Sequence, residues 1–191
     1  MAVRTAGACM VKKYIKNKFL AEAAEWIIAI AGMLALLLII RNFVFRSATV
    51  NSQSMEPTLY HGEKVIILKF PYLFGHPKAG DIIAFPYKTN PSQFFVKRII
   101  GEPGDVINIA DRRFTVNGAE IDDEFSDELL ISLGDAVFPI TVPDRSYFVL
   151  GDNRNSSNDS RFTGVGCIFE GDIIGKVVIR YWPLNKFAAV K

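Results

Sequence analysis

A run of 15 residues without a charged side chain, residues 26–40 (WIIAIAGMLALLLII), constrains this chain more than any other feature. The core helix of a soluble protein would show a polar face, and this run has none. A membrane-spanning helix needs about 20 residues, and apolar neighbours on both sides lengthen the segment to residues 23–45. We therefore expect a transmembrane anchor over residues 23–45 that contacts the lipid bilayer, with Trp26 at the interface.

A cleaved signal peptide is the alternative, because a basic segment precedes the apolar run and the run itself is short. Its cleavage site would have to lie within residues 45–50 (FRSATV). That stretch is a poor match to the usual pattern, in which two small residues are separated by one other. We therefore favour an anchor that is not cleaved.

Positive charge is concentrated before the apolar run, whereas only Arg41 and Arg46 follow closely after it. Basic residues flank the cytoplasmic side of membrane helices, so residues 1–22 are predicted to form a cytoplasmic arm. Residues 46–191 are then expected to form a large domain outside the membrane, and a second apolar run of this length is absent, which predicts a single pass. The basic residues before the run are Arg4, Lys12, Lys13, Lys16 and Lys18.

From Lys64 onward the chain consists of short runs rich in Val, Ile, Phe and Tyr, separated by turns that contain Gly, Pro or Asn. This spacing predicts antiparallel β-sheets rather than alternating strands and helices, and the pair Asn117-Gly118 predicts a hairpin. The fold expected is therefore mainly β, with a small acidic insert at about residues 119–146 whose acidic run, residues 122–130, is interpreted as a solvated surface loop. The predicted strands are residues 64–70, 81–85, 94–100, 105–109, 113–116, 147–150 and 172–181.

The net charge of the chain and its few cysteines and histidines indicate which partners and cofactors are not expected. A net charge of +2 gives no reason to expect a nucleic-acid partner. Two cysteines, Cys9 and Cys167, and two histidines cannot complete a common zinc site in this spacing. The predicted topology separates the two thiols across a membrane, so we expect both to be free, and we expect neither a metal nor another cofactor.

The segment 51–64 (NSQSMEPTLYHGEK) places two serines, Ser52 and Ser54, shortly after the anchor. A serine nucleophile needs a neighbouring base. The histidine candidates are His61, seven residues after Ser54, and His76, which lies in a loop between predicted strands. Nothing near either histidine in the sequence would orient it, so each is interpreted as a surface or structural residue.

Lysine is the other base available to a serine nucleophile, provided that burial lowers its pKa. Lys97 lies in the apolar run FFVKRII, where a strand would place Phe95, Lys97 and Ile99 on one face. Lys97 could therefore be a desolvated base, or an exposed lysine on an edge strand that protects against aggregation. The residues alone leave both interpretations open. Arg98 would point the other way and is interpreted as a surface charge.

A dense polar run, residues 151–161 (GDNRNSSNDSR), follows the predicted strand 147–150. Asp, Asn and Ser side chains form many local hydrogen bonds, so this run predicts a rigid loop that could orient a lysine base. It also contains two Asn-x-Ser sequences, at Asn155 and Asn158, which could be glycosylated in a eukaryotic secreted protein. We interpret them instead as a consequence of the polar composition of a catalytic loop.

Four blocks of the sequence belong together: residues 52–59 (SQSMEPTL), 80–85 (GDIIAF), 96–105 (VKRIIGEPGD) and 151–164 (GDNRNSSNDSRFTG). In this order they resemble the bacterial type I signal peptidases, which are Ser-Lys membrane proteases, in their short form with one anchor. The family often has Asp where this chain has Asn155 and where it has Glu63, and neither departure touches the serine or the lysine.

The resemblance implies that Ser54 attacks the scissile carbonyl, that Lys97 is the general base, and that Ser52 and the Ser54 amide form the oxyanion hole. It implies that Ser157 orients the lysine and that Asp159, Arg161 and Arg154 support the site. It also implies substrate pockets lined by Met55, Leu59, Phe95 and Val96.

The activity implied is the removal of signal peptides, with small residues near the cleavage site, from exported preproteins by a monomeric enzyme. One rival is a catalytically inactive relative that binds extended chains, but such a protein should lack the serine or the lysine. A peptidase specialised for one substrate stays open. A soluble self-cleaving Ser-Lys repressor is disfavoured by the anchor and by the lack of a DNA-binding segment.

Overall fold

The computed structural model describes residues 18–88, 90–121 and 129–190. The chain divides into two compact units, residues 1–44 and 45–191, each of which is treated by itself. Most of the predicted cytoplasmic arm and most of the acidic run lie outside the described residues. The sequence predictions that fall there concern Arg4, Cys9, Lys12, Lys13 and Lys16, together with residues 122–128.

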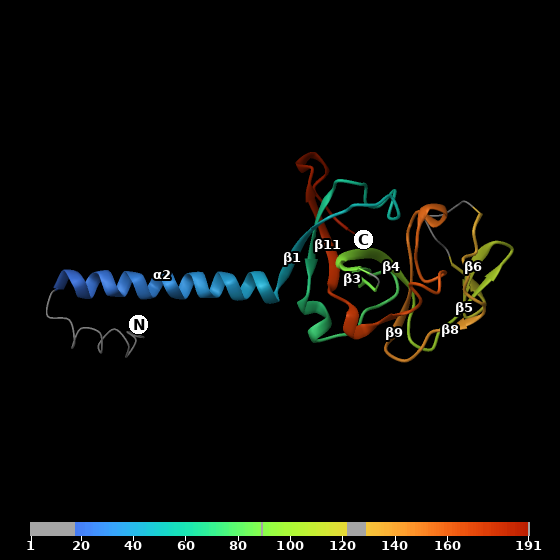
Figure 1. The fold of residues 1–191 in the computed structure, drawn as a ribbon, viewed down its shortest axis with the longest axis horizontal. Helices are drawn as coiled ribbons and strands as arrows, with labels where there is room; N and C mark the ends of the chain where they lie inside the picture. The colour runs from blue at the N-terminus through green and yellow to red at the C-terminus, as the bar shows by residue number, and fades with distance from the viewer. Residues whose placement is uncertain (1–17, 89, 122–128, 191) are drawn as a thin grey trace. The chain divides into compact units, whose positions relative to one another are not determined.

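In the described part of the first unit the chain forms the helix α2 (Lys18–Phe43), which begins before the predicted anchor (Figure 1). Ala, Leu and Glu, which favour helices, are frequent in it. Residues 20–38 are long and apolar enough to cross a membrane by length and composition. Apolar side chains point outward all around this helix, and Trp26 is 71% exposed. Such a surface is expected of a helix that lies in lipid rather than in a protein core.

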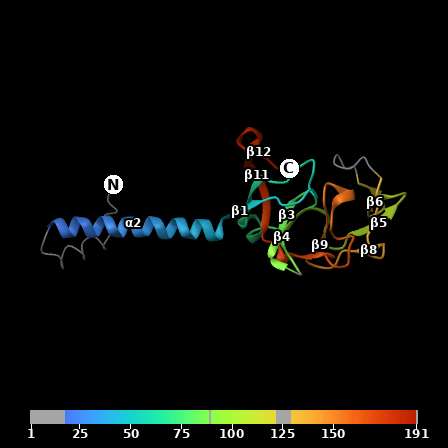
Figure 2. The same cartoon turned by 45° about the horizontal axis from the view of Figure 1, so that its top comes forward.

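The larger sheet of the second unit is antiparallel, with the spatial order β1-β2-β11-β3-β4-β9-β10 and with β12 paired to β11. Figure 2 shows β3, β4 and β9 in its middle. The short strands β10 and β12 were not predicted, and β1 begins at Phe45, which had been assigned to the anchor. The strands are β1 (Phe45–Thr49), β2 (Lys64–Leu68), β3 (Ile82–Tyr87), β4 (Asn90–Gly101), β9 (Ser146–Leu150), β10 (Ile168–Phe169), β11 (Gly175–Trp182) and β12 (Ala188–Ala189).

A smaller antiparallel sheet has the order β7-β6-β5-β8, and its β6–β7 hairpin turns at Asn117 and Gly118, as predicted. Both residues have positive φ angles, 53° and 83°, which Asn and Gly tolerate best. The mainly β, antiparallel fold expected from the sequence is thus confirmed. The strands are β5 (Val106–Ala110), β6 (Arg113–Val116), β7 (Ala119–Glu120) and β8 (Ile140–Thr141), and the short 3-10 helices are η1 (Phe70–Leu73), η2 (Arg154–Ser156), η3 (Glu170–Asp172) and η4 (Leu184–Lys186).

Strand β4 contributes to each of three clusters of buried apolar side chains found among the described residues. Val96 packs in the first, Ile99 in the second and Ile100 in the third. Ile99 and Ile100 point to opposite faces of β4 and both are buried, so both faces of this strand are covered. Any polar side chain in the middle of this strand is therefore removed from water unless it reaches a cleft.

Leu130, the last residue of the acidic run, is buried in the third cluster beside Phe114 and Phe148, so this one residue does not fit the interpretation of the run as a solvated loop. An apolar side chain gains free energy by leaving water, which explains the burial of Leu130. Leu129 is exposed, and residues 122–128 lie outside the described residues.

Candidate active site

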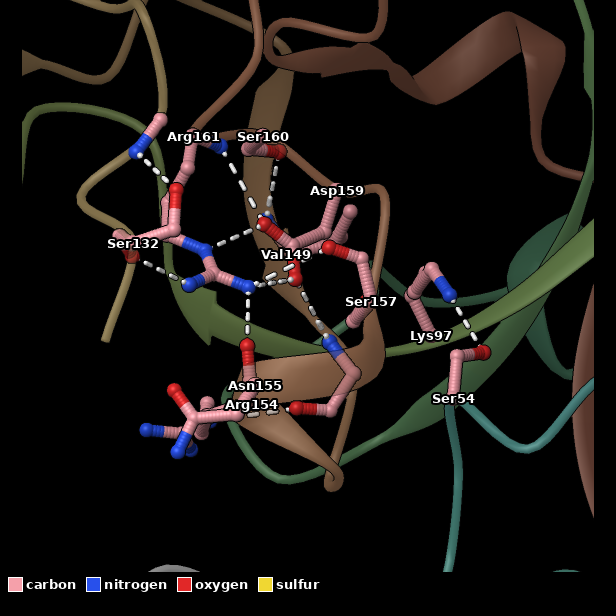
Figure 3. Close-up of polar contacts among 12 residues, drawn as sticks. Ser54, Lys97, Ser132, Val149, Arg154, Asn155, Ser157, Asp159, Ser160 and Arg161 are labelled. Carbon is pink, nitrogen blue, oxygen red and sulfur yellow. Dashed lines mark hydrogen bonds and ion pairs between the residues drawn. The ribbon is translucent and has the colours of Figure 1, made fainter. Parts of the chain in front are cut away.

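Ser54 and Lys97 lie in contact, although 43 residues separate them in the chain (Figure 3). Ser54 belongs to the turn region after β1, and Lys97 is in the middle of β4. The Lys97 Nζ donates a hydrogen bond of 2.6 Å to the Ser54 Oγ. The two residues are only 3% and 4% exposed, respectively. The structure thus brings together the serine and the lysine that the sequence singled out.

Burial decides between the two interpretations of Lys97. Its strand is central rather than at an edge, it pairs with Ile83 of β3, and its Nζ lies 5.4 Å from the centroid of the Phe95 ring. Desolvation lowers the pKa of Lys97 from its ordinary value to about 8, an effect opposed by the charges of Asp159 and Asp152. A sizeable fraction of the lysine is therefore neutral at mildly alkaline pH, as a proton acceptor must be.

Ser52 lies next to the same hydroxyl. Its Oγ is 3.0 Å from the Ser54 Oγ, and either oxygen can donate the hydrogen. Because Ser52 is exposed while Ser54 is buried, the pair spans the boundary between solvent and the buried lysine. A hydroxyl at this place could donate a hydrogen bond to an oxygen that develops negative charge beside Ser54.

Asp159 and Arg161 form a fully buried ion pair behind Lys97 (Figure 3). The Arg161 Nε and Nη2 donate to the two carboxylate oxygens of Asp159 at 2.8 and 3.0 Å. Asp159 also accepts a hydrogen bond from the Gly151 amide, and Arg161 donates to the carbonyl of Arg154. Such paired and hydrogen-bonded charges fix the course of a loop, as the polar run predicted.

Arg154 and Ser157 lie in the same loop. The Arg154 Nε donates to the Gly151 carbonyl at 3.1 Å, and burial lowers the pKa of Arg154 to about 10. The Ser157 Oγ is buried and has no hydrogen-bond partner among the described residues. The hydrogen bond from Ser157 to Lys97 that the resemblance implies is therefore not formed in this structure, although both side chains border the same site.

Gly151 allows the loop to approach the nucleophile. A Cβ at this position would lie 2.3 Å from the Ser157 Oγ and 2.4 Å from the carbonyl oxygen of Ser54. Both distances are far below van der Waals contact, so any side chain would push Ser54 and Ser157 apart. A second contact joins the same segments, because the Asn153 amide donates to the Ser54 carbonyl at 3.0 Å.

A cleft of about 440 Å³ opens onto Ser54 and Lys97. Met55, Phe95 and Val96, which the resemblance assigned to substrate pockets, line it. Leu59 does not line it and is fully buried in the first apolar cluster. Further lining residues were not predicted, although each is a near sequence neighbour of a predicted one. They are Thr49, Val50, Asn51, Gln93, Phe94, Ser156 and Asn158.

The interpretation of Arg98 as a surface charge was wrong. Its side chain is buried and makes two hydrogen bonds of 2.8 Å to Asp152, from Nε and from Nη2. Arg98 does point away from Lys97, as adjacent residues of a strand do. That opposite face is also covered, because Val96 and Ile100, which share it with Arg98, are buried in apolar clusters.

The two histidines lie apart from the cleft. His61 is exposed, and the His76 side chain is 80% exposed, with its Nδ1 3.1 Å from a carboxylate oxygen of Glu170. Neither histidine lines the cleft. Their interpretation as surface residues agrees with these positions.

The residue types that bind metals are scattered. In the described ranges, no three His, Cys, Asp or Glu side chains are grouped as a metal site would require. Cys167 is a free thiol whose pKa is raised by burial, and Cys9 lies outside the described residues.

Comparison with known proteins points to one family. The model of the family described as signal peptidase, peptidase S26, matches residues 23–182. The chain is 35% identical over 174 residues to signal peptidase I P of Bacillus subtilis subsp. natto, with 87% of this chain and 93% of the relative covered. It is 35% identical over 181 residues to signal peptidase IB of Staphylococcus aureus, with the same shares covered.

A solved structure is also similar to part of the chain. The crystal structure of a signal peptidase I from Enterococcus faecalis V583 is 32% identical to it, with a TM-score of 0.46. The similarity covers 53% of this chain and 97% of the crystallised chain.

Proposed function

The chain belongs to the signal peptidase family, peptidase S26, and from this premise we propose that Ser54 and Lys97 are the nucleophile and the general base that cleave signal peptides from exported preproteins. Membership makes the chain a membrane-associated serine endopeptidase of the signal peptidase type. The observation that carries the proposed roles is the 2.6 Å contact between the Lys97 Nζ and the Ser54 Oγ in a buried site.

The reaction is an acyl transfer in two steps. Neutral Lys97 accepts the proton of the Ser54 hydroxyl as the oxygen attacks the scissile carbonyl, and the lysine then protonates the leaving amine. Water hydrolyses the acyl-enzyme with Lys97 again as the base. The hydroxyl of Ser52 and the amide of Ser54 stabilise the negative charge on the tetrahedral intermediate. No cofactor takes part in these steps.

The loop of residues 151–161 keeps the lysine in place. We propose that Ser157 orients Lys97, since its hydroxyl is buried beside the site and has no hydrogen-bond partner among the described residues. Asp159, Arg161 and Arg154 hold this loop through the ion pair and the hydrogen bonds to main-chain carbonyls. Buried charges in this number are stable only when each has partners.

The substrate binds as an extended strand in the cleft beside β4, with its side chains in pockets lined by Met55, Phe95 and Val96. Leu59 supports this surface from the core, where it packs with Met55 and Val96 in the same cluster. The small residues found before signal-peptide cleavage sites suit shallow pockets of this kind.

Incubation of the detergent-purified protein with a preprotein tests these roles. Wild type should release the mature protein, seen as a band shift on a gel, whereas Ser54→Ala and Lys97→Ala should lose cleavage by at least about 10³-fold. A His61→Ala, His76→Ala double variant is the matched control and should stay active. Cleavage by Ser54→Ala would refute the nucleophile, and an inactive histidine variant would favour a histidine base.

The same experiment addresses the rival function of an inactive binding protein. A folded wild-type protein that binds preprotein without cleaving it would support that function. A panel of several preproteins separates a general enzyme from one specialised for a single substrate, because the specialised enzyme would cleave one of them only.

We further propose a single pass through the lipid bilayer, with the N-terminus in the cytoplasm, a span over residues 23–45 and the catalytic domain, residues 46–191, outside. The apolar, outward-facing surface of α2 and the basic residues before it support this topology. In a Cys167→Ser background, Cys9 should react with a membrane-impermeant maleimide only after permeabilisation. The thiol introduced by Asp144→Cys at an exposed position should react in intact cells.

We propose that the enzyme acts as a monomer, because Ser54, Lys97 and the cleft are all supplied by one chain. Light scattering of the detergent-solubilised protein, corrected for bound detergent, should give a protein mass close to 21.3 kDa. A mass of twice that value would contradict the proposal.

A further inference from the structure

Two strand edges without a partner strand lie beside the cleft that opens onto Ser54. β1 pairs only with β2, and β9 pairs with β4 only from Arg98 onward, so among the described strands one edge of residues 93–97 is unpaired. Residues 49–51 line the cleft on one side and residues 93–97 on the other. An extended peptide can add to such edges through main-chain hydrogen bonds, which gives the substrate a path along both strands.

Arg46 of β1 and Phe94 of β4 meet farther along this path. The guanidinium carbon of Arg46 lies 5.4 Å from the centroid of the Phe94 ring. Phe94 lines the cleft and precedes Lys97 by three residues, and Arg46 precedes Thr49, which lines the opposite side. Because a strand rises about 3.3 Å per residue, this contact joins the two strands about 10 Å from the lysine.

The charge of Arg46 is available to a ligand. Its side chain is exposed, and no group in the described part of the chain forms a hydrogen bond or an ion pair with its guanidinium. The attraction of a cation to the face of an aromatic ring needs no hydrogen-bond acceptor, so the N–H donors of Arg46 can bind a carboxylate. A lysine or arginine of the substrate would be repelled at the same place.

The direction of the chain indicates which part of the substrate reaches Arg46. Under the proposed topology Arg46 is the first residue after the span of residues 23–45, and Ser54 follows eight residues later. The apolar part of a signal peptide is suited to the same bilayer, so the residues before the scissile bond come from the membrane side. With the residue before that bond beside Lys97, roughly the fourth or fifth residue before the bond would lie near Arg46.

We propose that Arg46, held over the Phe94 ring, is a specificity-determining residue. It selects signal peptides that carry an acidic side chain at about the fourth or fifth residue before the scissile bond, and it disfavours those with a basic side chain there. This inference rests on the proposed function of Ser54 and Lys97. It extends substrate recognition beyond the small residues next to the bond.

Peptides that differ at one residue test this selectivity. Each has alanine at the first and third positions before the bond, and glutamate, alanine or lysine at the fourth or at the fifth. With the full-length protein in an uncharged detergent at low salt, kcat/KM for the glutamate peptide should exceed that for the lysine peptide by about fivefold. The ratio should approach one in about 1 M salt, because salt screens charges at an exposed site.

Variants of Arg46 identify the source of the preference. Arg46→Gln should abolish the ratio, Arg46→Glu should reverse it, and Arg46→Lys should keep it. Arg145→Gln is the matched control, because Arg145 is also exposed and lies 5.3 Å from the centroid of an aromatic ring, that of Phe169, but does not line the cleft. It should leave the ratio unchanged. Each ratio compares two peptides on one protein sample, so it does not depend on the fraction of active protein.

Equal rates for the three peptides, or an unchanged preference in Arg46→Gln, would overturn the inference while leaving the roles of Ser54 and Lys97 intact. The second outcome is also expected if Arg46 binds lipid phosphate instead of substrate. A preference confined to charges placed after the scissile bond would overturn it as well. If wild type cleaves none of the peptides, the proposed function fails, and fluorescence anisotropy of the labelled peptides then decides: tighter binding of glutamate than of lysine that is lost in Arg46→Gln supports the inference, and equal binding refutes it.

Discussion

At the scale of single residues, the proposed mechanism makes the site reactive only when Lys97 has lost its proton. Its pKa is lowered to about 8 chiefly by burial, and only the neutral amine can accept the proton of Ser54. Activity should therefore be low at acidic pH, rise through a midpoint near the lysine pKa, and be highest on the alkaline side. Measurement of kcat/KM from about pH 6 to about pH 10 checks this prediction.

The sign of this pH dependence separates a lysine base from a histidine base. A histidine with an ordinary pKa of about 6.5 would already be neutral at pH 8, so its profile would be flat across the range in which Lys97 titrates. A profile that is flat from mildly acidic to alkaline pH would therefore contradict Lys97 as the base.

The proton on Lys97 also affects stability. Since the folded pKa lies below the ordinary value of 10.5, the unfolded chain binds this proton more tightly than the native protein does. The contribution of Lys97 to stability therefore rises as pH increases from about 8 towards 10.5. Burial of the charged form of Lys97 lowers the stability of the folded protein. Functional sites commonly have such a cost in stability.

At the scale of secondary-structure elements, the turn region between β1 and β2, which carries Ser54, is held to β11 by hydrogen bonds of Arg180. Glu63, at the end of this turn, is buried, and it accepts hydrogen bonds from Arg180 of β11 at 3.2 Å and from the Tyr60 amide at 3.0 Å. The ammonium group of Lys186 lies 3.5 Å from its other oxygen. Arg180 also donates to the carbonyl of Thr58. The departure from the Asp that the family often has at this position thus lies in a cluster of charges, in which one oxygen of Glu63 accepts hydrogen bonds and the other, Oε1, has an ion-pair contact but no hydrogen-bond partner among the described residues.

Arg180→Met removes the principal partner of this buried carboxylate. We expect the free energy of unfolding of residues 45–191 to fall by about 3 kcal/mol, because the buried carboxylate would keep only the Lys186 ammonium and the Tyr60 amide as partners. Equilibrium denaturation in urea measures this change. Arg113→Met, which breaks an exposed ion pair, should cost less than about 1 kcal/mol. Equal losses in the two variants would show that the cluster at Glu63 contributes no more than a surface pair.

At the scale of the whole molecule, the two compact units differ in what they contain: the apolar helix α2 lies in the first and the candidate active site in the second. The three clusters of buried apolar side chains found among the described residues lie within residues 45–191. The site residues, from Thr49 to Asn158 around the cleft, all belong to the second unit. Folding of the site therefore depends on the second unit, and membrane attachment depends on the first.

A variant that lacks residues 1–44 should accordingly fold and cleave a soluble peptide substrate. It should also lose its attachment to membranes, because the only described helix that is long and apolar enough to span one is removed. Circular dichroism, peptide cleavage and flotation with lipid vesicles measure these three properties. Loss of the folded state would show that the helix is required by the catalytic domain, contrary to this expectation.

Local pattern predicted most of the fold. The apolar run predicted α2, the alternating or continuous apolar runs predicted the longer strands, and Asn117-Gly118 predicted a hairpin. Three of the strands that were missed, β8, β10 and β12, are two residues long, whereas β1, which was missed as well, has five residues and one buried side chain. Strands of this length carry too little pattern to be recognised, since their existence depends on pairing with a distant neighbour.

The sequence by itself determined the family, because four motifs occur in one order. Two of these motifs contain the serine and the lysine of the candidate site. Only the tertiary structure decided whether Lys97 is buried, because that depends on whether β4 is central or at an edge and on which side chains pack against its faces. Packing on the other face of β4 buries Arg98, whose interpretation as a surface charge assumed that this face was open to solvent. Strand order arises from contacts between residues far apart in the chain, and no local pattern of side chains contains that information.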